Sequence, residues 1–161
     1  AIFMKSGMLH AYLHGVGVEI MANSDNVLRG GLTSKHIDVP ELMHVVQFDA
    51  LLDPIAPAEN VVLSSHGIVP AEGIETVEYL TPVPEFRLSR SHLAPCRESH
   101  LGIEGPFIVL VTEGTVTLTS RECPEGLSVS AGHAAWVGAW EDRPTIATGE
   151  NSATVFIARV P

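Results

Sequence analysis

The protein has 161 residues, which corresponds to about one domain on the usual scale of about 100–200 residues per domain. Hydrophobic residues make up 45% of the sequence and charged residues 17%, which excludes a disordered chain and disfavours a highly charged helical bundle. Nine Lys and Arg stand against nineteen Asp and Glu, a formal net charge of −10. This charge argues against a general nucleic-acid-binding protein, because such proteins present a basic surface.

No apolar stretch approaches the about 20 residues of a membrane span, so we expect a cytoplasmic protein without a membrane partner. Cys96 and Cys123 lie far apart and form no Cys-x-x-Cys motif, so we expect reduced thiols rather than a fold built on disulfides. The sequence begins at Ala1, directly in an apolar run and without an initiator Met. We therefore expect it to be part of a longer protein.

The first fifty residues combine short apolar runs with turns. Extended segments are expected over residues 2–4 and 9–13. Residues 16–22 are apolar except for Glu19, which predicts a buried strand that carries one carboxylate. A helix is expected over residues 40–46, because it would have Pro in its first turn, where the missing N–H costs nothing.

The remainder of the chain predicts a linker followed by β-structure. Residues 53–78 contain several Pro and Gly residues and only short apolar runs, which indicates a linker. Glu113 and Gly114 stand between two apolar or alternating runs and predict a hairpin. The spacing of the strands fits a β-sandwich or barrel. Strands are expected at 85–89, 107–111, 115–118, 127–130, 134–137 and 153–160.

Polar residues suited to a binding site gather between residues 7 and 35. A neutral imidazole is the commonest metal ligand, and an Arg–Lys pair suits a phosphate because Arg offers a planar fork and Lys a point charge. Three simpler interpretations remain open: a structural or surface histidine, a Glu19–Arg29 ion pair, and a helix-capping cluster at 23–26. The candidate residues are His10, Tyr12, His14, Glu19, Asp25, Arg29 and Lys35.

The order of residues in this segment is more specific than its composition. Leu9-His10-Ala11-Tyr12-Leu13, the run over residues 17–33, Lys35, and Asp38-Val39-Pro40-Glu41-Leu42 closely resemble type I mannose-6-phosphate isomerases. The resemblance continues more weakly to the end of the chain and covers only the C-terminal part of that family's architecture. It implies a metal-dependent cupin enzyme with a second, C-terminal cupin-like jelly roll.

The resemblance implies roles for individual residues. His10 matches the family's last zinc ligand, and Arg29 matches its active-site arginine. Four further residues match positions that line the sugar-phosphate pocket, namely Lys35, Glu19, Tyr12 and Asp25.

The resemblance also implies what this sequence lacks. The family's zinc site needs a Gln-x-His pair and a Glu, yet no Gln-x-His or His-x-His pair occurs in the 161 residues. Zinc sites take three or more protein ligands. We therefore expect the other ligands to lie upstream of Ala1 and the chain by itself to be inactive.

A second segment, over residues 131–137, is similar to the strand–turn–strand element at residues 5–10. Ala135 follows Gly132 at the spacing where His10 stands in the first element. We therefore expect no metal ligand in the second segment, and a structural role for the C-terminal region.

The expected fold class is all-β, a cupin or jelly-roll β-sandwich with a few short helices. The expected organisation is a C-terminal segment of the catalytic cupin over 1–52, a linker over 53–78, and a cupin-like jelly roll over 79–161. The implied activity is interconversion of mannose 6-phosphate and fructose 6-phosphate through an enediol, with one zinc per full-length enzyme. The implied partner is a small sugar phosphate.

Two other function classes remain open. One is a non-catalytic sugar-phosphate-binding or structural cupin module, and the other is an oligomerisation domain. Exposed strand edges would favour self-association in either case.

Overall fold

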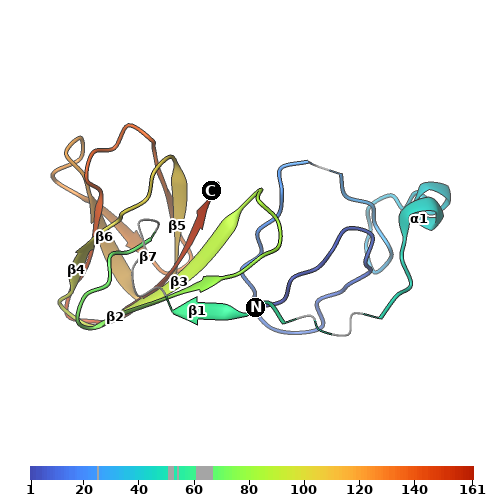
Figure 1. Ribbon diagram of the computed structural model, residues 1–161, viewed down its shortest axis with the longest axis horizontal. Coiled ribbons are helices and arrows are strands. Elements are labelled where there is room, and N and C mark those ends of the chain that lie inside the picture. Colours follow the sequence, from blue (N-terminus) through green and yellow to red (C-terminus); the bar gives the residue numbers. More distant parts are fainter. Residues whose placement is uncertain (25, 51–52, 54, 61–66) are drawn as a thin grey trace. The chain divides into compact units, whose positions relative to one another are not determined.

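The computed structural model describes residues 1–24, 26–50, 53, 55–60 and 67–161 (Figure 1). Its internal contacts divide the chain into two compact units, residues 1–56 and 57–161. We call them the N-terminal unit and the sandwich unit. In the described ranges, no helix has both the length and the apolar character needed to cross a membrane.

The N-terminal unit contains the predicted helix. Helix α1, Val39–Val45, begins after Asp38, whose side chain accepts a hydrogen bond of 3.1 Å from the backbone N–H of Glu41. This is the usual cap for a free N–H at a helix start, and Pro40 occupies the first turn as expected. The prediction of a helix at 40–46 is therefore confirmed within one residue at each end.

The three strands predicted in the first 22 residues are not formed. Among the described residues of this unit, β-pairing is limited to isolated bridges, Ile2 with Ile55 and Met8 with Gln47. Val16, expected in a buried strand, is fully exposed. An apolar run becomes a strand only where a partner strand takes up its N–H and C=O groups. The described part of this unit offers such a partner only at single residues.

The sandwich unit holds all ten strands that the described residues form (Figure 1). They make two antiparallel sheets, one of six strands in the order β1-β2-β3-β10-β5-β8 and one of four in the order β4-β9-β6-β7. The strands are β1 Ala58–Asn60, β2 Ile74–Tyr79, β3 Arg87–Leu93, β4 Glu98–His100, β5 Phe107–Glu113, β6 Thr115–Thr119, β7 Leu127–Ser130, β8 Ala134–Val137, β9 Thr145–Thr148 and β10 Ala153–Arg159.

The core of the sandwich unit consists of apolar side chains at alternate strand positions. Strand β5 contributes Phe107, Val109 and Val111, all 2% exposed or less. Such alternation is what an antiparallel strand with one face on a core requires. Buried polar groups are few, and two of them satisfy each other: the hydroxyls of Thr76 and Ser91 lie 2.8 Å apart. The all-β sandwich predicted from strand spacing is confirmed.

Strands β5 and β6 follow each other in the chain but lie in different sheets, so the predicted hairpin at Glu113 and Gly114 is wrong. Strand β5 pairs with β10 and β8, whereas β6 pairs with β7 and β9. Gly114 has φ +74°, and a Cβ there would overlap the carbonyl oxygen of Ser152. The glycine therefore serves a corner where the chain passes from one sheet to the other.

Four strands lie outside the predicted strand segments. Strands β1 and β2 come from the segment that the sequence predicts as a linker, and β4 and β9 are short. Strand β2 pairs along its whole length with β3, from Ile74 opposite Leu93 to Tyr79 opposite Leu88. Pairing with the distant strand β3 therefore makes a strand of residues 74–79, although the Pro and Gly residues before them suggest a loop.

Candidate functional site

A glycine turn positions the segment that carries His10. Gly7 has φ +84°, and a Cβ there would lie 2.9 Å from the carbonyl oxygen of Val45. The Gly7 carbonyl accepts a 2.8 Å hydrogen bond from the backbone N–H of Gln47, just after α1. Only glycine adopts this conformation at such close approach without strain. The turn therefore anchors the chain two residues before the predicted metal-binding segment.

His10, Tyr12 and Glu19 form a connected group in the N-terminal unit. The rings of His10 and Tyr12 meet edge to face, with centroids 6.0 Å apart and planes at 87°. Desolvation raises the pKa of the Tyr12 phenol above its ordinary value, and hydrogen bonding to the Glu19 carboxylate and the negative charge of that group raise it further. The titration of Tyr12 is therefore coupled to Glu19.

The sequence left open whether Glu19 pairs with Arg29. In the described part of the chain, neither Glu19 nor Arg29 takes part in an ion pair, and Glu19 instead raises the pKa of Tyr12. Gly30 lies against Leu9, because a Cβ on Gly30 would come within 2.7 Å of the Leu9 Cδ2 atom. This contact brings the backbone beside Arg29 next to the segment of His10.

Lys35 and Asp25 complete the set of predicted substrate-binding residues. Lys35 is exposed, and its backbone N–H donates to the Thr33 Oγ1 at 3.1 Å in a local turn. Asp25 lies outside the described residues. The structure thus brings His10, Tyr12 and Glu19 together and places Arg29 beside them only through the Leu9–Gly30 contact. Among the described residues, no side-chain hydrogen bond or ion pair joins Lys35 to this group.

His10 alone of the candidate residues matches a zinc ligand of the resembled family, so the fit of a zinc ion depends on the groups around it. The His10 Nδ1 atom lies 3.4 Å from the Met8 carbonyl oxygen, a backbone partner of the kind that orients metal-binding imidazoles through their second nitrogen. No group of three His, Cys, Asp or Glu side chains in the described ranges could hold a metal ion. His10 fits as one ligand, but the described residues of this chain do not form a zinc site by themselves.

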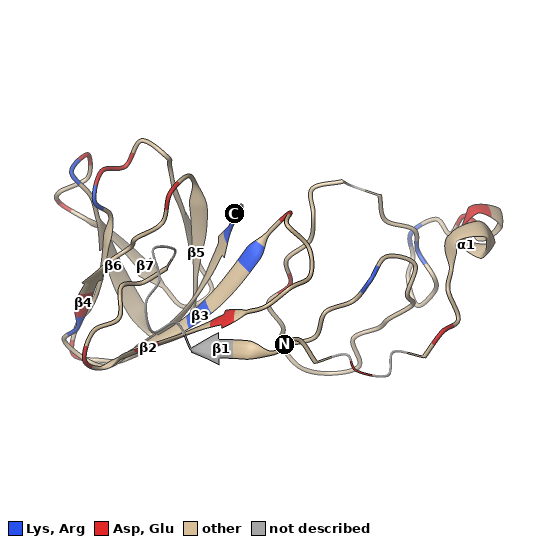
Figure 2. Ribbon diagram, viewed as in Figure 1, with Lys and Arg blue, Asp and Glu red and all other residues tan. Residues whose placement is uncertain are grey.

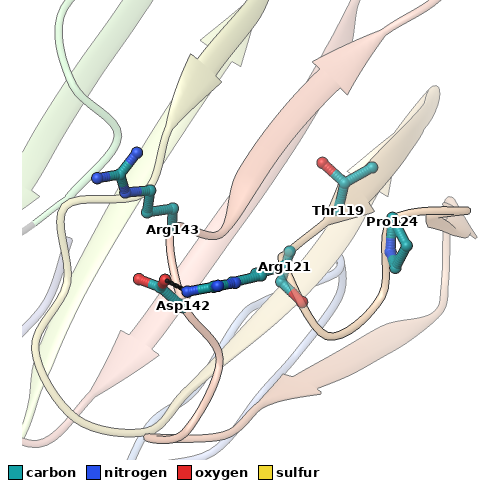
Figure 3. A pocket seen from close by; sticks show the side chains of 6 residues that line it. Thr119, Arg121, Pro124, Asp142 and Arg143 are labelled. Atoms are coloured by element: carbon teal, nitrogen blue, oxygen red, sulfur yellow. Dashed lines mark hydrogen bonds and ion pairs between the residues drawn. The ribbon is translucent and has the colours of Figure 1, made fainter.

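A hollow in the sandwich unit was missed by sequence reasoning. It lies between the loop after β6 and the loop before β9, with the ion pair of Arg121 and Asp142 on its wall (Figure 3). The two loops are about twenty residues apart, and a linear motif does not connect them. The sequence feature that could have indicated this hollow is the pair of charged clusters at residues 121–122 and 141–143.

The fold defines the class of protein: a two-sheet antiparallel sandwich of the cupin type, preceded by a unit that carries the polar motif. A mutant of phosphomannose isomerase from Salmonella typhimurium superposes with a TM-score of 0.57 at 27% identity, over 86% of this chain and 32% of that protein. No family model matches the sequence.

The sequence comparisons identify the relatives more closely. The chain is 36% identical over 149 residues to mannose-6-phosphate isomerase of Salmonella typhimurium, covering 92% of this chain and 34% of the relative. It is 33% identical over 156 residues to the Escherichia coli protein of that name, covering 97% of this chain and 37% of the relative. The chain is a homologue of mannose-6-phosphate isomerases and spans about a third of their length.

Proposed function

We propose that this chain is the part of a zinc-dependent isomerase that supplies the arginine, the lysine and one metal ligand for interconverting mannose 6-phosphate and fructose 6-phosphate. The observation that carries the proposal is the 36% identity to a mannose-6-phosphate isomerase over 92% of the chain. The reaction would move a proton between C1 and C2 of the sugar through an enediol. A phosphorylated metabolite as substrate is in keeping with a cytoplasmic protein.

Two cations have distinct parts in this proposal. Arg29 would stabilise the oxyanion that develops during enediol formation, because a guanidinium presents a planar fork of N–H donors. Lys35 would hold the phosphate as a point charge. Both side chains are exposed, and Arg29 makes no ion pair among the described residues, so its donors are free for a ligand.

Tyr12 and Glu19 would orient the sugar. Like any tyrosine whose pKa is not lowered, Tyr12 is protonated at neutral pH, so its phenol would serve as a hydrogen-bond donor rather than a general base. Glu19 raises the pKa of that phenol, and the Tyr12 ring lies edge to face with His10. Asp25 is proposed as a further substrate contact on the resemblance alone.

His10 would provide one ligand to zinc, with the other ligands outside this sequence. Zinc bound there would act as a Lewis acid toward the sugar oxygens. The backbone contact of His10 with Met8 supports the ligand role, because it leaves the Nε2 atom as the free coordinating nitrogen.

The test is a chimera in which residues 1–161 replace the matching third of the Salmonella typhimurium enzyme. We expect the chimera to bind zinc and to interconvert the two sugar phosphates in a coupled assay. A second chimera with His10→Ala should lose zinc. A folded, zinc-loaded chimera without isomerase activity would contradict the proposal.

A non-catalytic sugar-phosphate-binding module is the second candidate, because the described residues offer only one suitable zinc ligand. Mannose 6-phosphate binding by the 161-residue chain, measured together with the activity of the chimera, separates the two. We expect the chain alone to show neither turnover nor stoichiometric zinc. Mannose 6-phosphate binding by the chain alone, combined with an inactive chimera, would favour the module.

A further inference from the structure

Two neighbouring hollows lie in the sandwich unit and share one residue, Arg143. The first has a volume of about 560 Å³ and lies between the loop after β6 and the loop before β9 (Figure 3). The second has a volume of about 330 Å³ and is lined by Arg143 with His100, Leu101 and Pro144. The first is lined by Thr119, Ser120, Arg121, Pro124, Asp142 and Arg143.

The two loops around the first hollow are bonded to each other. The backbone N–H of Arg121 donates to the Asp142 carbonyl at 3.0 Å, and the backbone N–H of Asp142 donates to Glu122 Oε2 at 2.7 Å. The Ser120 hydroxyl donates to the Glu141 carboxylate. These bonds fix the walls before any ligand arrives, which lowers the cost of binding.

The same bonds occupy three acidic groups of the loops, and none of them involves the Arg143 guanidinium. Glu122 and Glu141 accept the bonds just described, and Asp142 pairs with Arg121 at 3.5 Å. Arg143 makes no ion pair within the described residues and extends away from the Arg121–Asp142 pair (Figure 3). A guanidinium carries five N–H donors, so Arg143 offers a complete fork to a ligand.

The backbone at Arg143 is also unusual. Its φ of +51° lies in the left-handed region, which costs any residue with a Cβ and is avoided by most except Gly and Asn. A loop that needed only this turn would be more stable with glycine there. Strain of this kind clusters at ligand-binding positions, where the surrounding structure holds it. Leu32 and Cys96 share the conformation, so the backbone of Arg143 adds to the argument only together with its guanidinium, which is unpaired among the described residues.

We propose that Arg143, which lines both hollows, binds a small oxyanion carrying a phosphate or a carboxylate group. Every cation in residues 57–161 is an arginine, and two of them line this hollow. Arginine matches both oxyanions through paired N–H donors, whereas lysine offers a point charge. None of these residues belongs to the site proposed for the isomerase reaction, so this site is an additional one.

The charge balance predicts the strength of the site. Glu122, Glu141 and Asp142 outnumber the two arginines, and acidic and basic segments are interspersed along the unit (Figure 2). The local charge is therefore negative and opposes an anion at long range, so binding depends on direct contacts with the Arg143 guanidinium. We expect dissociation constants in the millimolar range.

The test is a titration of the isotope-labelled 161-residue chain with inorganic phosphate, and separately with acetate, followed by NMR. We expect saturable shifts confined to the amides of residues 119–124 and 142–144. Arg143→Ala should weaken the binding about tenfold or more, because a charge-assisted hydrogen bond contributes at least that factor. Arg143→Lys should retain part of the affinity for phosphate. Arg90→Ala removes another exposed arginine and should leave that affinity unchanged.

Arg143→Gly separates binding from folding. Glycine keeps the left-handed backbone and removes the guanidinium, so the melting temperature should stay the same or rise while phosphate binding is lost. Saturation by phosphate rather than acetate identifies a phosphate site, and the reverse identifies a carboxylate site. Equal binding by the Arg143→Gly variant, shifts spread over the whole chain, or no saturable binding of either anion would overturn the proposal.

Discussion

The N-terminal unit and the sandwich unit differ in what their residues do. The described residues of the N-terminal unit include the motif shared with mannose-6-phosphate isomerases, yet its apolar side chains are mostly exposed, among them Leu13, Val16 and Leu32 at 95% or more. The sandwich unit contributes nearly all of the buried hydrophobic side chains and two complete sheets. The residues that point to chemistry and the residues that stabilise the fold therefore lie in different parts of the sequence.

One element occurs in both units and makes the difference clear. Gly7 and Gly132 both have φ +84°, and both begin a short turn that carries a histidine. His10 and His133 each place Nδ1 3.4 Å from the carbonyl of the residue two positions earlier. The turn itself therefore needs no surrounding core, and only the side chains placed after it distinguish a candidate metal ligand from a structural turn.

The largest effect is expected from a core phenylalanine. Phe107 is 2% exposed in the sandwich unit and Phe48 is 76% exposed in the N-terminal unit, so they form a matched pair. Phe107→Ala should lower the free energy of unfolding by about 3–5 kcal/mol, whereas Phe48→Ala should change it by less than about 0.5 kcal/mol. Urea unfolding followed by the fluorescence of Trp136 and Trp140 measures the Phe107 variant, and the hydrogen-exchange protection of the Gln47 amide measures the Phe48 variant in its own unit. Similar losses from the two variants would contradict the contrast between the units.

The second effect concerns turnover rather than stability. In the active chimera with the Salmonella typhimurium enzyme, Arg29→Ala should lower kcat about 10²–10³-fold, the loss typical of one electrostatic donor. Zinc content, measured by metal analysis, should not change. Arg90→Ala, an exposed arginine of strand β3, is the control and should keep full turnover. Unchanged kcat in the Arg29 variant would remove this residue from the mechanism.

A smaller effect is expected from the paired glycine turns. Gly132→Ala creates no steric clash but places alanine in the left-handed region. It should therefore lower the free energy of unfolding by about 1–2 kcal/mol, measured by the same fluorescence experiment. Gly7→Ala should leave that transition unchanged and instead reduce the hydrogen-exchange protection of the Gln47 amide. If Gly7→Ala shifted the fluorescence transition as much as Gly132→Ala, the units would not unfold separately.

The smallest effect is a shift in one titration. Glu19→Gln removes the negative charge beside the Tyr12 phenol, so the pKa of Tyr12 should fall toward its ordinary value, and the phenolate should form at lower pH. Ultraviolet titration in a Tyr79→Phe background reads Tyr12 alone, because the sequence has two tyrosines. Glu41→Gln on helix α1 serves as the control. An unchanged Tyr12 titration in the Glu19 variant would disprove the contact.

Local signals predicted much of this fold. The pattern of apolar and polar residues predicted β6, β7 and β8. Proline after an aspartate cap predicted α1. Pairing partners were not predictable in the same way, because they depend on residues far away in the sequence. The Glu113-Gly114 corner has the residues of a hairpin turn, and only the position of Ser152 against Gly114 makes it a passage between sheets.

The candidate site was predictable in composition but not in contacts. The order of residues from His10 to Lys35 singled out the segment, whereas the choice of Tyr12 rather than Arg29 as the partner of Glu19 depends on chain geometry. Residues 16–22 predicted a buried strand from hydropathy alone, and that prediction was wrong because hydropathy does not reveal whether a partner strand is present.

The position of β10 has a consequence for how the chain is made. Strand β10 lies between β3 and β5 in the middle of the six-stranded sheet, although it is the last strand in sequence order. During synthesis β3 and β5 leave the ribosome long before Ala153–Arg159 can join them, so both expose unpaired edges in the meantime. Closure of the sandwich must therefore wait until Arg159 has emerged, and chains stalled before residue 153 should be prone to aggregation.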